Sequence, residues 1–246
     1  MSRHVIAKIL TAALAIIILA GCSSKKSNPV GPDSTNPFNP SVVSLNTPDK
    51  ALLLCGANFT GEAYTYTTLA KKYDSLFSHL TPSGTPADSI VDGDSVVYTW
   101  TADQLGIKLI RRDTASAYGW RIIFNGNRSG IDYTDWTYIE AGEKHDKSIG
   151  AMQLTENLVG APNYHWGWTL IGGQTNVLIN WYVGVNHMEV KISLSSDKTG
   201  YLECYVNDAI DWKVDWGSGR PSCSGMWYDY TEGHVTSSGS WGYSEG

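Results

Sequence analysis

Four consecutive segments of the chain alternate apolar and polar residues with a period of two, and this pattern constrains the fold more than any other feature. Successive side chains of a strand point to opposite faces, so each segment is predicted to be a strand with one apolar face. Short polar loops join the segments, which favours an antiparallel meander. The apolar members are Val177, Ile179, Trp181 and Val183; Met188, Val190, Ile192 and Leu194; Leu202, Cys204 and Val206; and Ile210, Trp212, Val214 and Trp216.

The loop lengths predict a register for these strands. We take 184–187 as a four-residue loop and 207–209 as a tight turn, and we match the apolar rows across the longer loop at 195–201. A slip by one residue would move every apolar side chain to the other face, so the unbroken rows favour this register. The predicted pairs are Val183 with Met188, Ile179 with Ile192, Ile192 with Cys204, Cys204 with Trp212, and Val206 with Ile210.

The same register predicts that charged residues alternate in sign on the opposite face. Glu203 lies across from Lys213, and Tyr205 lies between Lys191 and Asp211. Opposite charges placed across strands stabilise a sheet, whereas a general acid needs an apolar pocket to raise its pKa. These carboxylates are therefore interpreted as structural, and not as the paired acids of a glycosidase.

Further strands are expected from Ser95 onward, near 105–112, 118–124, 131–139, 148–154 and 166–171, with a turn at Asn125-Gly126. Asp88, Asp92 and Asp94 lack the spacing and the closing glutamate of a calcium loop, so 88–94 is read as a polar turn. Upstream, residues 48–80 are predicted to be helical because an apolar stripe has helical spacing. Its members are Leu69, Tyr73, Leu76, Phe77 and Leu80.

These elements predict a mainly β fold for a single domain at 46–246, with a helical part at 48–80 and a β-meander at 95–242. The sheet is expected to be a curved open sheet or a barrel, with the amphipathic helix packed on its apolar face. A weak internal echo, Asp146-Lys147-Ser148 and Asp197-Lys198-Thr199, is compatible with duplicated hairpins or with ordinary turn chemistry.

The N-terminus has the order of a secretory signal. Basic residues at 3 and 8 precede an uncharged apolar run that ends at Cys22, too short to span a bilayer. The closing residues Leu19-Ala20-Gly21-Cys22 resemble the lipobox of bacterial lipoproteins. This resemblance implies that residues 1–21 are a signal peptide, that cleavage precedes Cys22, and that Cys22 is acylated.

Residues 22–45 are rich in Pro, Ser and Asn, and are expected to form a tether between the acylated Cys22 and the domain. The same resemblance to bacterial lipoproteins implies that Ser23 after the cysteine favours the outer membrane, with the domain facing the periplasm or the outside. Loss of Arg3 and Lys8 with the signal changes the net charge from −6 to −8. An acidic surface argues against nucleic acid as a partner.

Catalytic motifs for nucleophilic, phosphate or zinc chemistry are missing from the sequence, and no cofactor or metal is expected. Three cysteines remain after Cys22, namely Cys55, Cys204 and Cys223, so at most one disulfide can form. Cys204 is interpreted as a small buried hydrophobe between Ile192 and Trp212. The protein is therefore not expected to be an enzyme.

Two binding hypotheses stand beside a structural role in the cell envelope. Exposed aromatic rings next to carboxylates can stack on sugars, and the candidates for such a glycan site are Tyr182, Tyr201, Tyr205 and Trp227. Alternatively, the apolar face encloses a lipid or another hydrophobic ligand. In layout, the body of the chain resembles the curved-sheet lipoproteins that carry lipids or other lipoproteins. The expected partners are thus the membrane and a hydrophobic ligand, a glycan or an envelope protein.

Overall fold

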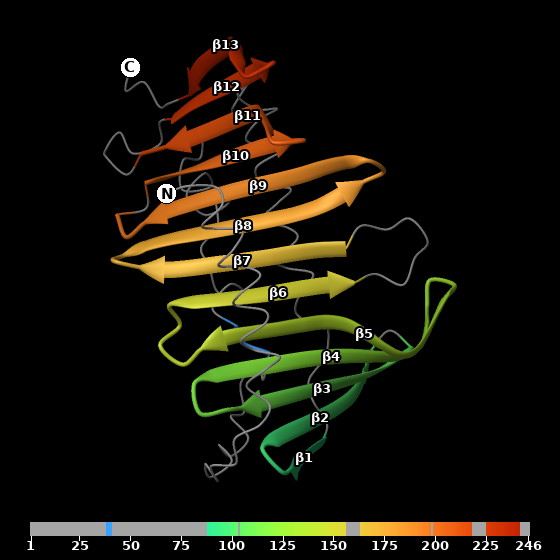
Figure 1. Cartoon of the computed structure of the whole chain (residues 1–246). Coiled ribbons are helices and arrows are strands. Elements are labelled where there is room, and N and C mark those ends of the chain that lie inside the picture. Colours follow the sequence, from blue (N-terminus) through green and yellow to red (C-terminus); the bar gives the residue numbers. More distant parts are fainter. Residues whose placement is uncertain are drawn as a thin grey trace, which may run out of the picture. The chain divides into compact units, whose positions relative to one another are not determined.

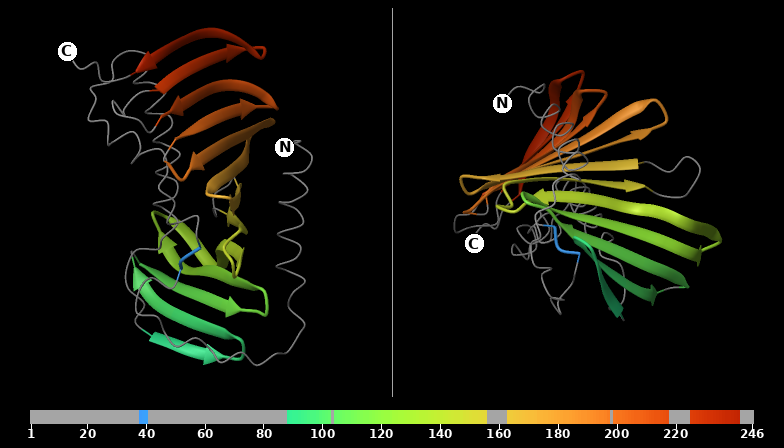
Figure 2. Two further views of the ribbon diagram at one scale, coloured as in Figure 1. Left: turned by 90° about the vertical axis from the view of Figure 1, so that its left-hand side faces the viewer. Right: turned by 60° about the horizontal axis from the view of Figure 1, so that its bottom comes forward.

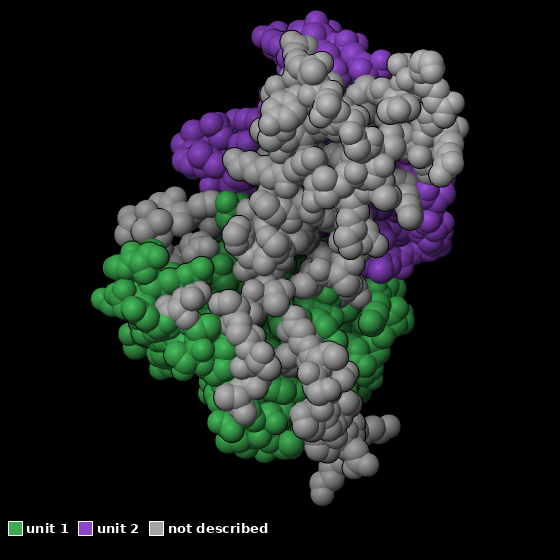
Figure 3. Space-filling model, turned by 180° about the vertical axis from the view of Figure 1, so that it is seen from behind, with its two compact units in different colours: residues 1–44, 80–167 green, residues 45–79, 168–246 purple. Residues whose placement is uncertain are grey.

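The computed structural model describes residues 38–40, 88–102, 104–155, 163–197, 199–217 and 225–241. Internal contacts divide the chain into two compact units (Figure 3). Unit 1 comprises residues 1–44 and 80–167, and unit 2 comprises residues 45–79 and 168–246. The predicted helix at 48–80, the signal peptide and Cys22 lie outside the described residues.

The described residues form 13 strands in one antiparallel sheet, and the strand order follows the chain from β1 to β13 (Figure 1). The sheet is not closed, so the open form is confirmed and the barrel alternative is wrong. Among the described residues, no helix is long and apolar enough to cross a membrane. The strands are β1 Asp88–Asp92, β2 Ser95–Ala102, β3 Leu105–Asp113, β4 Ala117–Arg128, β5 Ile131–Lys144, β6 Ile149–Thr155, β7 Asn163–Ile171, β8 Gln174–Val183, β9 Asn186–Ser195, β10 Gly200–Val206, β11 Ala209–Trp216, β12 Gly225–Thr231 and β13 His234–Trp241.

In unit 1 the strands form a single layer (Figure 2). Their buried side chains lie in rows across the sheet. One row runs through Tyr98, Leu109, Ile122, Ile139 and Leu154, which face each other strand by strand from β2 to β6. All five are at most 5% exposed. Because residues of one row share a face, this face is the apolar face of unit 1.

Unit 2 has an apolar face of the same kind. A row runs through Val177, Ile192, Leu202, Val214 and Trp227, from β8 to β12. The segments 177–183, 188–194, 202–206 and 210–216 are all strands, as the alternation predicts. The face of almost every apolar residue in them is therefore confirmed, although several predicted partners are wrong.

The predicted register between β8 and β9 is displaced by two residues. The strands are joined by Gly184 and Val185 alone, and not by a four-residue loop. Val183 consequently lies opposite Asn186 instead of Met188, and Ile179 lies opposite Val190 instead of Ile192. Gly184 has φ +61°, a conformation that glycine adopts without strain and that suits a two-residue hairpin turn.

A similar two-residue displacement occurs between β9 and β10, where Cys204 pairs with Val190 and not with Ile192. Between β10 and β11, the predicted pairs Cys204–Trp212 and Glu203–Lys213 are confirmed. A bulge between Cys204 and Tyr205 changes the register closer to the turn.

The bulge makes two predicted neighbours wrong. Tyr205 faces Ile210 and not Asp211, and Val206 faces Ala209 and not Ile210. On the other side, Tyr205 faces Glu189, whereas Lys191 faces Glu203. The extra residue of a bulge stays outside the regular ladder, and Asp211 has that position here.

Two turn assignments in unit 1 also differ from expectation. Asn125-Gly126 is not a turn but an irregularity within β4, and the chain reverses only after Arg128. The Asn125 amide donates to the carboxylate of Asp135 at 3.0 Å, and its oxygen accepts from the Asp135 backbone N–H at 2.8 Å. The polar turn read at 88–94 contains a short strand, β1, and the turn itself is confined to Gly93 and Asp94.

Candidate functional site

The polar face of unit 2 carries two of the predicted glycan-site tyrosines, and both rings contact lysines. The Lys191 Nζ lies 3.9 Å from the centre of the Tyr205 ring, and the Lys213 Nζ lies 5.1 Å from the centre of the Tyr201 ring. A cation over an aromatic face is attracted to it, more strongly when both are shielded from water. A sugar stacking on these ring faces would therefore compete with lysines already in place.

Glu203 connects these pairs into one network. The Tyr205 hydroxyl donates to Glu203 Oε2 at 2.8 Å, and Lys213 Nζ lies 3.5 Å from Glu203 Oε1. Lys191 also forms an ion pair with Glu189 at 2.9 Å. Both oxygens of Glu203 therefore have partners, and the side chain is fixed on the face. We call this set, comprising Glu189, Lys191, Tyr201, Glu203, Tyr205 and Lys213, the lysine–tyrosine network.

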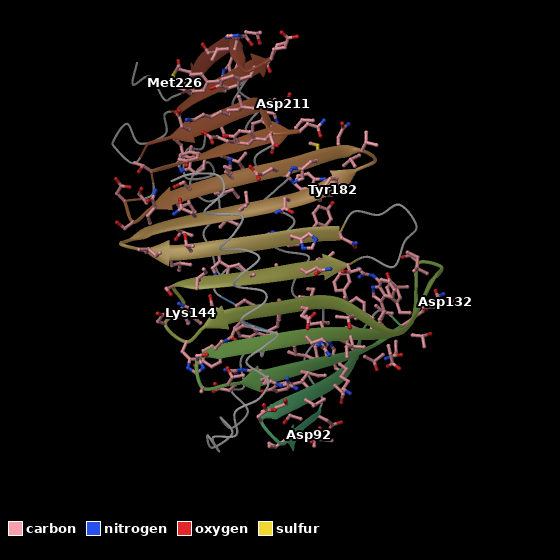
Figure 4. The ribbon with its side chains drawn as sticks, in the orientation of Figure 1. Asp92, Asp132, Lys144, Tyr182, Asp211 and Met226 are labelled. Atoms are coloured by element: carbon pink, nitrogen blue, oxygen red, sulfur yellow. The ribbon has the colours of Figure 1, made fainter. Side chains whose placement is uncertain are left out.

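Tyr205 is too buried to present its ring to a sugar. It is 9% exposed, whereas Tyr182 is 62% exposed. Tyr182, which is labelled in Figure 4, lies near the end of β8. Its ring contacts that of His187, with ring centres 5.1 Å apart. Tyr182 is thus the most accessible of the predicted sugar-binding residues, but it stands outside the lysine–tyrosine network.

The fourth predicted residue of the glycan site, Trp227, lies on the other face. It faces Val214, whereas its neighbour Tyr228 faces Lys213 on the polar side. Trp227 is buried, and its indole covers Gly239 on β13 so closely that a Cβ there would come within 2.7 Å. The four predicted residues therefore do not form one site.

Asp211, at the β10–β11 bulge, is the described carboxyl whose pKa is raised. Burial is the main cause, and the negative charge of Asp229 adds to it. The Tyr230 hydroxyl also has a raised pKa, chiefly through burial. Within the described ranges, no three His, Cys, Asp or Glu side chains are arranged to hold a metal ion.

A second polar cluster ends the apolar face of unit 1. Asp113, Tyr118 and Glu143 face each other across β3, β4 and β5. His145 Nε2 lies 2.8 Å from Asp113 Oδ1, and its ring centre lies 4.5 Å from that of Tyr118. Glu143 is 1% exposed, and Arg111 lies over the Tyr118 ring at 5.4 Å. His145 is thus paired with Asp113.

The apolar face of unit 1 also receives a residue from the segment predicted to be the tether. Phe38 is 1% exposed, and its ring meets that of Trp120 edge-on, with centres 6.4 Å apart. Aromatic rings prefer this arrangement, which adds to the free energy of burial. The sequence gives one signal for it, because Phe38 is the only aromatic residue between Cys22 and Pro40.

Two indoles of unit 1 differ in how their N–H groups are satisfied. Trp136 Nε1 donates to the backbone carbonyl of Thr155 at 2.8 Å. Trp166, on β7, is 1% exposed, and its Nε1 has no hydrogen-bond acceptor among the described residues. A buried donor left without an acceptor costs about 1–3 kcal/mol, so Trp166 stands out as a group that needs a further partner. Nothing in the sequence distinguishes it from the other tryptophans.

Comparison with protein-family models, with curated proteins and with solved structures finds no match for this chain. Its function is therefore inferred from the residues and geometry described above.

Proposed function

We propose that this chain is an outer-membrane lipoprotein, anchored through an acylated Cys22, whose β-domain binds a hydrophobic ligand on the apolar face of its sheet. The proposal includes no catalytic step and no cofactor. The domain faces the periplasm or the outside of the cell, and residues 22–45 link it to the membrane.

The observation that carries this proposal is the separation of the two faces of the sheet. In unit 2, the polar face is held together by the lysine–tyrosine network, whose charged groups pair with each other. The apolar face presents large aromatic side chains instead, among them Trp181, Trp212 and Trp227. Large apolar surfaces with a few polar groups are typical of small-molecule sites.

The apolar face of unit 2 is wider than one helix can cover, which favours a ligand in addition to the predicted helix. Five strands, β8 to β12, contribute to it in unit 2, which corresponds to a width of about 24 Å at about 4.8 Å per strand. A helix is only about 10 Å wide. We place the predicted helix at 69–80 on an apolar face as part of the cover. Since the rows are buried, a ligand would lie between the sheet and the segments that cover it.

Two adjacent residues of β8 provide a matched test. Trp181 is 7% exposed on the apolar face, and Tyr182 is 62% exposed and points to the opposite side. We expect brominated laurate to quench the tryptophan fluorescence of the native protein saturably. Trp181→Leu should weaken this binding, and Tyr182→Leu should leave it unchanged. Far-UV circular dichroism checks that both variants are folded.

The same pair separates the alternatives. Binding of a glycan that Tyr182→Leu abolishes and Trp181→Leu preserves would support a carbohydrate-binding module. If brominated laurate quenches only the unfolded chain, and mass spectrometry finds no lipid that copurifies, the hydrophobic-ligand function is refuted and a structural role in the envelope remains.

A further inference from the structure

The indole of Trp166 combines two properties that rarely occur together. Its side chain is 1% exposed, and its N–H has no acceptor among the described residues. The large majority of buried side-chain polar atoms in folded proteins have a hydrogen-bond partner. An acceptor that belongs to a bound molecule would complete this site.

Trp166 lies in a predominantly aromatic and apolar part of unit 1. On the same side of β7, Tyr164 has its ring centre 5.5 Å from that of Trp166. On the next strand in the sheet order, β6, Met152 and Leu154 are buried and belong to the rows of the apolar face. A ligand here would need an apolar body, because the ring next to Trp166 is aromatic and the buried residues of the neighbouring strand are apolar.

We propose that the Trp166 N–H binds the carbonyl oxygen of an acyl ester or acid whose hydrocarbon chain occupies the apolar face. This inference rests on the proposed function and adds the chemical class of the ligand. An indole N–H is a neutral donor that cannot accept a hydrogen bond. It therefore selects a molecule with an acceptor over a plain hydrocarbon, and over one whose only polar group is a donor.

The test uses the full mature chain in amphipol, with methyl laurate as the probe that carries an acceptor and dodecane as the probe that lacks one. The tryptophans are labelled with ¹⁵N at the indole, and the Trp166 resonance is assigned by its loss in Trp166→Phe. We expect methyl laurate to move the Trp166 indole proton downfield, and dodecane to leave its position nearly unchanged.

Trp166→Phe keeps an aromatic side chain and removes the donor. We expect it to weaken methyl laurate binding about threefold to tenfold, the range that corresponds to one net hydrogen bond. Dodecane binding should be unchanged. This variant removes an unsatisfied buried donor together with part of the ring, so it should destabilise the ligand-free protein less than the same change at an indole whose N–H is bonded.

Trp136→Phe is the matched control, because its N–H is already bonded to Thr155 within the protein. It should lower the stability of the ligand-free protein and leave the ratio of methyl laurate to dodecane affinity unchanged. A decrease in the ratio of methyl laurate to dodecane affinity in both variants would indicate a general packing effect and would overturn the assignment to Trp166.

The remaining outcomes separate this inference from the function on which it rests. If both probes bind and the Trp166 proton instead exchanges magnetisation with a bound water that methyl laurate does not displace, the donor serves a water only. The inference then fails and the hydrophobic-ligand function stands. If neither probe binds the native protein, both fail.

Discussion

The ion pair between Glu203 and Lys213 should contribute measurably to stability, unlike most pairs on a sheet surface. We expect a double-mutant cycle with Glu203→Gln and Lys213→Met to give a favourable coupling of about 1 kcal/mol. Urea unfolding of the four proteins, followed by circular dichroism, measures it, provided that the dependence of free energy on urea stays constant across the series.

The magnitude follows from distance and burial. Lys213 Nζ lies 3.5 Å from Glu203 Oε1, and the two side chains are 26% and 18% exposed. At this separation the Coulomb energy is ~1.2 kcal/mol in water and ~4.7 kcal/mol at an effective dielectric constant of ~20. Desolvation of both charges cancels a large part of the higher value. A net coupling of about 0.5–1.5 kcal/mol remains, and added salt should weaken it only in part.

Arg121 and Glu140 form the matched control. Their atoms are closer, at 2.7 Å, but the side chains are 51% and 44% exposed. Exposed pairs typically contribute about 0.2–1 kcal/mol and are screened by salt. If distance dominated, this pair would couple more strongly than Glu203–Lys213. A coupling for Arg121–Glu140 that equals or exceeds the other would refute the view that burial decides the strength of these contacts.

Four further predictions concern single groups. Cys22→Ser should abolish labelling by fatty acid, whereas the wild-type mature protein should carry acyl chains by mass spectrometry. Cys204, which is 2% exposed, should react with a thiol reagent only after unfolding, and rapid labelling of the native protein would contradict its placement. The Asp146 carboxyl accepts hydrogen bonds from the Ser148 side chain and backbone, which lower its pKa. The ionised carboxyl should therefore stabilise the fold above the ordinary pKa of about 3.9, and this effect should be lost as the pH falls through the lowered pKa. Ser148→Ala should raise the pKa of Asp146 measured by NMR. Burial raises the pKa of Asp211, so its ionised form destabilises the fold. Asp211→Asn should therefore raise the melting temperature at neutral pH, and this advantage should shrink as the pH falls through the raised pKa and be lost below the ordinary value of about 3.9.

The sheet face on which a side chain lies was more predictable from the sequence than its partner on the neighbouring strand. The loop between β8 and β9 has two residues instead of four, so Ile179 pairs with Val190 and not with Ile192. A displacement by two residues keeps every side chain on its face, because the strand period is two. The turn between β10 and β11 has two residues and not the three predicted, but the bulge between Cys204 and Tyr205 restores the predicted register on the side away from the turn, and Glu203–Lys213 is therefore confirmed. The bulge beside Tyr205 has no sequence signal that we recognise, so the neighbours beyond it were not predictable.

The internal echo illustrates how far turn chemistry alone can imitate a repeat. Asp146 and Asp197 each accept from the backbone N–H and the hydroxyl of the residue two positions on, at 2.9 and 2.6 Å and at 3.0 and 2.7 Å. These are the same local turns on hairpins four strands apart. These hydrogen bonds give the likeness a physical reason in ordinary turn chemistry.

The glycan site was the least predictable feature, because its residues come from several strands and their arrangement depends on the register between those strands. Alternation within one strand put Tyr201 and Tyr205 on the same face, and the structure agrees. Whether a ring face is available depends on the lysines across the strands, which requires the register to within one residue. Trp227 shows the same dependence, since its pairing with Val214 puts it on the face opposite the tyrosines.

Burial by itself does not separate a filled core from a core that holds a ligand, so the proposed ligand is argued from the two indoles of unit 1. At Trp136 the chain supplies an acceptor from the last residue of β6, so this sheet is able to satisfy an indole N–H with its own backbone. At Trp166 it supplies none among the described residues. A cost of about 1–3 kcal/mol is a substantial share of the 5–15 kcal/mol that stabilises a typical domain. An apolar residue at this position would avoid that cost. The needs of packing alone therefore do not explain the unpaired donor, and this is the ground on which the proposal of a ligand carbonyl at Trp166 rests.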